Sequence, residues 1–169
     1  MTGEPRRYRY VGPADVLATV LPGGEGRPIT SPADLAAWLA DRGPAELAEP
    51  FTFVVDLGGT LRLAPRRSEH VACAAGEPVR GAGEIAFRRA GGRWIVSEVS
   101  NQSTGYCPDP DSWPAVADAL DRAGLAHPGK LTAPVVFRRC PGCGGRNLVK
   151  DGDFVCAVCG GELPEEWNF

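Results

Sequence analysis

Four cysteines near the C-terminus have the residue type and spacing of a metal site. The first pair lies in Cys140-Pro-Gly-Cys143-Gly-Gly and the second in Cys156-Ala-Val-Cys159-Gly-Gly, with twelve residues between the pairs. Two residues between paired cysteines let both sulfurs reach one ion from a tight turn, and Zn²⁺ takes four thiolates in tetrahedral geometry. The glycine after each pair tolerates the positive φ of such a turn. We therefore predict that one Zn²⁺ is bound by Cys140, Cys143, Cys156 and Cys159.

The segment between the two pairs favours a zinc ribbon over residues 135–169. Strand-like residues flank Asp151-Gly152, which is a strong hairpin turn signal. Four cysteine ligands leave no open coordination position, so the predicted role of the ion is structural. Two local disulfides or a redox pair are the alternatives. A reducing cytosol and the two matching turns both disfavour them.

The charge of the predicted ribbon bears on nucleic acid as a partner. Residues 135–169 carry four positive and five negative side chains, and a zinc–tetrathiolate centre adds roughly −2. A phosphate-binding surface needs clustered positive charge. The ribbon is therefore expected to stabilise the fold or to contact protein rather than nucleic acid.

A second group of residues in the body could bind a ligand or transfer protons. His70 precedes a glycine-rich turn, and Glu84 opens a predicted strand over 84–89. If that strand pairs with 94–100, Glu84 lies near the polar residues that follow the partner strand. We predict a ligand-binding cleft with His70 partly exposed in it. Its predicted members are His70, Glu84, Asn101, Ser103 and Tyr106, and all except Asn101 are also catalytic candidates. Purely structural hydrogen bonding is the alternative for each of them.

The same residues resemble a known module. The pattern His-x5-Gly-x-Pro-Val-x2-Ala-Gly-Glu begins at His70, and Asn-x-Ser-x2-Tyr-x-Pro begins at Asn101. Residues 51–115 thereby resemble the globular region of plant calmodulin-binding proteins that carry an IQ motif, and uncharacterised bacterial relatives. Gly105 stands where that family has a second histidine, and no IQ motif is found in this chain. The resemblance implies a fold more than an activity.

An arginine-rich segment over residues 62–93 indicates a third candidate function. It holds seven arginines against three glutamates. These arginines would bind a small anionic ligand if they converge on a concave pocket, and nucleic acid if they form a flat stripe. The arginines are Arg62, Arg66, Arg67, Arg80, Arg88, Arg89 and Arg93.

The elements that must position these residues predict an α+β fold with a mainly antiparallel sheet. Two hairpins are predicted, 51–64 and 84–100, each turning at paired glycines. Helices are predicted after Pro13, after Ser31 and after Asp111 or Ser112. A short strand is predicted over 8–11, and another over 134–139 leads into the cysteines. The domains are then a body over 1–134 and the ribbon over 135–169.

Composition sets the remaining limits. The chain has 169 residues, 43% hydrophobic and 23% charged, with a formal charge of −3. This is the composition of a globular domain, and no apolar run or leader indicates a membrane span or secretion. We therefore predict a cytoplasmic zinc-containing binding or regulatory protein whose partner is a protein or a small anionic ligand. The alternatives are an enzyme, such as a group transferase or hydrolase, and a nucleic-acid-binding protein.

Overall fold

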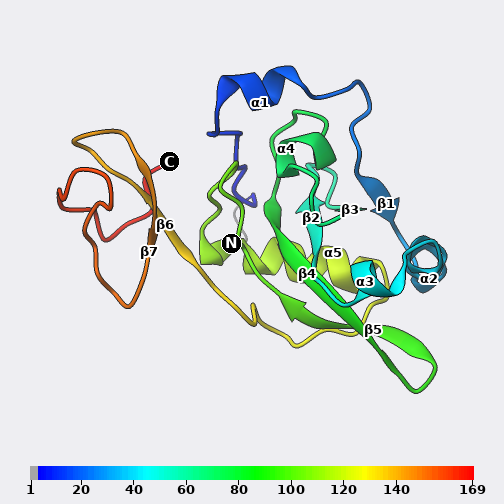
Figure 1. Cartoon of the computed structure of the whole chain (residues 1–169). Coiled ribbons are helices and arrows are strands. Elements are labelled where there is room, and N and C mark those ends of the chain that lie inside the picture. The colour runs from blue at the N-terminus through cyan, green and yellow to red at the C-terminus, as the bar shows by residue number, and fades with distance from the viewer. Residues whose placement is uncertain (1–3) are drawn as a thin grey trace.

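The computed structural model describes residues 4–169, so the first three residues of the predicted body lie outside the described part. The fold is α+β, as predicted, with two antiparallel sheets (Figure 1). The larger sheet has the strand order β1-β3-β2-β4-β5, and β6 pairs with β7 in the smaller one. The strands are β1 (Arg27–Ile29), β2 (Phe51–Val55), β3 (Leu61–Ala64), β4 (Gly81–Ala90), β5 (Arg93–Val99), β6 (Val136–Arg139) and β7 (Arg146–Val149). The helices are α1 (Ala14–Ala18), α2 (Pro32–Ala40), α3 (Pro44–Leu47), α4 (His70–Cys73) and α5 (Trp113–Arg122), with a 3₁₀ turn over Pro110–Ser112.

Both predicted hairpins of the body are confirmed. Strand β2 pairs antiparallel with β3, and β4 pairs antiparallel with β5. The β4–β5 turn uses Gly91 and Gly92, whose φ values of 57° and 79° favour glycine. Strand β2 also pairs with β4, which places the two hairpins side by side at the centre of the sheet.

The first predicted strand and the third helix need correction. Within 8–11, Tyr8 makes an isolated strand-like bridge to Val79, and the N–H of Val11 donates instead to the carbonyl of the loop residue Gly105 over 2.7 Å. Helix α5 follows a 3₁₀ turn that Asp109 caps by accepting from the N–H of Asp111. Ser112 occupies the N-cap position of α5 without a side-chain cap. The capping carboxylate therefore lies two residues earlier than predicted.

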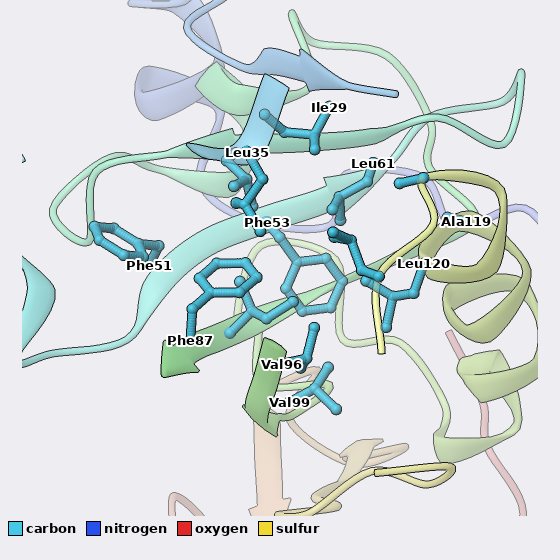
Figure 2. Close-up of a cluster of buried hydrophobic side chains, with 14 of the residues drawn as sticks. Ile29, Leu35, Phe51, Phe53, Leu61, Phe87, Val96, Val99, Ala119 and Leu120 are labelled. Atoms are coloured by element: carbon cyan, nitrogen blue, oxygen red, sulfur yellow. The ribbon is translucent and has the colours of Figure 1, made fainter. Parts of the chain in front are cut away.

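Helices α2 and α5 cover one face of the larger sheet. The hydroxyl of Ser31 accepts from the N–H of Asp34, 3.1 Å away, and so caps α2 as predicted. The buried side chains of this core come from both helices and from alternate strand positions (Figure 2). They include Leu35, Trp38 and Leu39 of α2, Phe51 and Phe53 of β2, and Val116 and Leu120 of α5.

The opposite face of the sheet carries a second core. Tyr8, Val54, Val71 and Tyr106 are buried there, with Val16 of α1 packed against them. Because successive strand residues point to opposite faces, Thr52 and Glu84, which are paired across β2 and β4, share this face with Val54. This face therefore carries Glu84 and Tyr106, two members of the predicted polar cluster, on the side away from α2 and α5.

The smaller sheet and the cysteine cluster lie beside the body, and the C-terminal tail joins the two (Figure 1). The indole N–H of Trp167 donates to the carbonyl of Cys107 over 2.8 Å, and its ring packs edge-on against Tyr8. The side chain of Asn168 bonds the backbone of Arg139 at both N–H and carbonyl. Trp167 thus fixes the tail to the body, and Asn168 fixes the tail to strand β6 of the ribbon. In the described residues, no helix is long and apolar enough to cross a membrane.

Candidate metal centre

The four cysteines predicted to bind metal lie together. Their Sγ atoms are all within 4.8 Å of one another. The Sγ atoms of Cys140 and Cys159 are 3.6 Å apart, and so are those of Cys143 and Cys156. Four thiolates around Zn²⁺ at about 2.3 Å would stand roughly 3.8 Å apart, so the sulfurs are already close to that arrangement. The four residues could therefore hold a metal ion.

The two cysteine turns have the same backbone geometry. In the first, the N–H of Gly144 donates to the carbonyl of Cys140, and the N–H of Cys140 to the carbonyl of Gly145, both over 2.8 Å. The second turn repeats both bonds, from Gly160 to Cys156 over 2.9 Å and from Cys156 to Gly161 over 2.8 Å. Gly144 and Gly160 share a φ of 75°, which is why glycine follows each pair.

Strands and bridges bring the two turns together. Strand β6 leads into the first turn and β7 leaves it, with Arg139 paired to Arg146. The second turn is closed by a bridge between Val155 and Glu162. The predicted turn at Asp151-Gly152 connects them, with φ values of 55° and 70°. The C-terminal cluster is thus compatible with the predicted zinc ribbon.

Asn147 supports the centre, and the sequence reasoning missed it. Its side-chain N–H donates to Cys156 Sγ over 3.3 Å, and its Oδ1 accepts from the N–H of Ala157 over 2.8 Å. The backbone N–H of Cys159 and then this amide lower the pKa of Cys156 to about 6. The only sequence signal was an asparagine just inside the first predicted strand after the cysteine turn.

The cluster favours a cation on electrostatic grounds. The N–H of Gly145 donates to Cys143 Sγ and favours its thiolate. Together, the neighbouring Sγ atoms of Cys156, Cys159 and Cys140 and the loss of solvation outweigh this and raise the pKa of Cys143 to about 12. The negative charge of one thiolate therefore disfavours ionisation of the neighbouring thiols. A divalent cation offsets this repulsion and allows all four cysteines to ionise together.

The predicted cleft residues mostly bond the backbone. His70 Nε2 lies 2.8 Å from the carbonyl of Gly83, so this nitrogen carries the proton. Tyr106 donates its hydroxyl to the carbonyl of Glu77 over 2.7 Å. Ser103 Oγ accepts from the N–H of Tyr106, and Asn101 bonds both backbone groups of Val135. These contacts hold loops in place.

The structure brings some of these residues together and separates others. The N–H of Glu84 donates to Ser100 Oγ, as expected for the open end of the hairpin. Glu84 and Ser100 line one cavity with Gln102. Tyr106 lines a different cavity with Trp167, and His70 lines neither of the two. Burial lowers the pKa of His70, which keeps the ring neutral.

The two cysteines outside the cluster are buried thiols. Burial raises the pKa of Cys73 and of Cys107 to about 12 in each case. A thiol nucleophile needs the opposite shift. Neither cysteine is therefore poised for nucleophilic chemistry.

The seven arginines of residues 62–93 do not form one face. Arg62 pairs with Asp56 over 2.8 Å, and Arg80 donates to the carbonyl of Leu57. Arg66 lies 3.9 Å from Glu49. Arg89 and Arg93 converge on a cavity at the end of the β4–β5 hairpin.

Comparison of the chain with protein-family models, with curated proteins and with solved structures found no match.

Proposed function

We propose that this chain is a cytoplasmic zinc-containing binding protein in which one Zn²⁺ has a structural role. The observation that carries the proposal is the clustering of four Sγ atoms within 4.8 Å, on two turns of matching geometry. Zn²⁺ is preferred over harder cations because every ligand is a thiolate. A reducing compartment suits the proposal, since the thiols must stay reduced to bind.

The structural role follows from the ligand set and from the tail. Four protein ligands leave no coordination position for water or substrate. The ribbon has a small core of its own, formed by Cys140, Cys156 and Leu163, so a bound ion would supply much of its folding free energy. In the tail, Trp167 bonds the body and Asn168 bonds Arg139 of the ribbon, so the tail connects this folded unit to the body.

An enzyme is less well supported as the alternative. His70, Ser103 and Tyr106 each use their polar atom to bond the backbone. Burial raises the pKa of Tyr106 and lowers that of His70. A neutral, backbone-bonded histidine and a protonated tyrosine are typical of residues that hold a fold together.

Cobalt substitution tests the proposed ligand set. Co²⁺ added to the metal-free protein should give the intense thiolate charge-transfer and visible bands of a tetrahedral four-sulfur site. The Cys143→Ser variant should lose sulfur-to-metal intensity, and Cys73→Ala, which removes a cysteine outside the cluster, should keep it. An octahedral, oxygen-type spectrum, or equal loss in both variants, contradicts the proposal.

A further inference from the structure

A cavity lies between the β4–β5 hairpin and the first turn of α2. Its volume is about 550 Å³, within the range of small-molecule sites. In Figure 1 the tip of this hairpin projects beyond the rest of the larger sheet. The lining residues belong to three segments far apart in the sequence: α2, the hairpin, and the loop that follows α5.

The charge of the cavity wall is entirely positive. In the part of the chain that the structure describes, Arg89 and Arg93 are the only ionisable residues that line it. Within residues 4–169, neither guanidinium has an ion-pair partner, whereas Arg62 and Arg66 of the same segment do. The nearby carboxylate of Asp34 accepts from the N–H and hydroxyl of Thr30 and does not line the cavity. Arg89 also donates to the carbonyl of Gly92 over 3.4 Å, so two guanidiniums without a carboxylate partner in the described residues line the same space.

The remaining wall is apolar and partly aromatic. Arg89 and Trp94 are paired across the two strands, and the Arg89 guanidinium lies 4.9 Å from the indole ring centroid. This cation–π contact positions the charge beside the cavity. Pro32, Ala33 and Ala36 of α2 face Trp94 across the space. The wall thus combines two guanidinium groups with an apolar surface.

We propose that this cavity binds a small phosphate monoester with an apolar or aromatic substituent. Guanidinium groups bind phosphate oxygens through paired, charge-assisted hydrogen bonds, and two of them suit a dianion. The apolar wall suits the substituent, which inorganic phosphate lacks. This gives a ligand class to the binding role proposed above, and it rests on that role but on none of the zinc ligands.

The concave placement favours a small ligand over nucleic acid. A nucleic-acid surface needs several cations aligned along a strip. Arg62 and Arg66 pair with carboxylates of the body and Arg80 bonds a backbone carbonyl, whereas Arg89 and Arg93 line a cavity rather than a strip. Nucleic-acid binding is therefore an outcome of the test that would overturn the proposal.

Titration of the zinc-loaded protein with phenyl phosphate, followed by ¹H–¹⁵N NMR, tests the site. Shifts are expected at the Trp94 indole and at the Gly92 and Ala33 amides, with weaker binding of inorganic phosphate. Arg89→Gln and Arg93→Gln should each raise the Kd about 10-fold. Arg88→Gln is the matched control, because Arg88 lies on the same strand but does not line the cavity.

Three results would overturn the proposal. The first is no shift at these residues with millimolar phenyl phosphate. The second is an equal loss of affinity in Arg88→Gln, which would indicate general charge attraction. The third is tighter binding of single-stranded oligothymidine than of phenyl phosphate, weakened equally by all three variants. Zinc content is measured on the same samples, so failure here is distinct from failure of the zinc proposal.

Discussion

At the residue scale, hydrogen bonds to the backbone account for most of the polar side chains near the ends of β4 and β5. His70 ties α4 to β4 through the carbonyl of Gly83. Asn101 ties the strand end to the segment leading into the ribbon. The sequence could indicate that such residues gather there, because strand pairing places them. It could not assign their partners, since backbone carbonyls carry no sequence signal.

Replacing His70 should reduce stability. His70→Ala leaves the Gly83 carbonyl without its donor, so the free energy of unfolding should fall by about 1–3 kcal/mol. His70→Gln, whose side-chain amide also donates, should recover part of the loss. Urea unfolding measures both. Unchanged stability in His70→Ala would contradict the structural role.

His70 should also make stability depend on pH. Burial lowers its pKa below the ordinary 6.5, so the unfolded state binds a proton more readily than the folded state. The stabilisation is therefore present above pH 6.5 and lost as pH falls below it. From about pH 7.5 to about pH 5.5 the urea midpoint of the wild type should fall further than that of His70→Gln. Acid would also release bound zinc, but from both proteins alike. Parallel pH profiles of the two urea midpoints would contradict the prediction.

At the element scale, the cap of α2 and the glycine turns could be predicted, whereas the cap before α5 and the shortest segments could not. Ser31 and the paired glycines of the hairpins carry their own local signals, so α2, β2–β3 and β4–β5 could be predicted. Strand β1 and helices α3 and α4 have three or four residues each, too few for a periodic pattern. They form because they pack on the sheet.

The cap of α2 provides a test at this scale. Ser31→Ala removes the acceptor for the N–H of Asp34, and this should cost about 1 kcal/mol of stability. Ser31→Asn retains a capping oxygen and should cost much less. Thermal unfolding of the two variants makes the comparison, and equal losses would show that the cap contributes nothing.

At the scale of the whole molecule, the tail holds the ribbon on the body together with the bonds between Asn101 and Val135. Trp167 packs against Tyr8, and the guanidinium of Arg6 lies 4.7 Å from the centroid of the Trp167 ring. The clustering of the four cysteines could be predicted, because the spacing of the two Cys-x-x-Cys pairs indicates it. The docking of the tail and the cavity at Arg89 and Arg93 could not, because both depend on how distant segments pack.

Trp167→Ala should loosen the ribbon from the body without removing its metal. The loss of one hydrogen bond and one aromatic pair should cost about 2 kcal/mol. ¹⁵N relaxation should then show the ribbon tumbling partly independently of the sheet, with zinc content unchanged. Trp167→Phe, which keeps the ring contact, is the control. Unchanged relaxation in Trp167→Ala would mean that other contacts hold the ribbon.

The central claim is that four thiolates hold one structural zinc. Elemental analysis of freshly purified, reduced protein tests it most directly, combined with amide hydrogen exchange before and after chelation. We expect about one zinc per chain, and faster exchange over 140–160 after chelation while the 51–100 sheet stays protected. Metal-free protein with Cys140–Cys143 and Cys156–Cys159 joined as disulfides would contradict it.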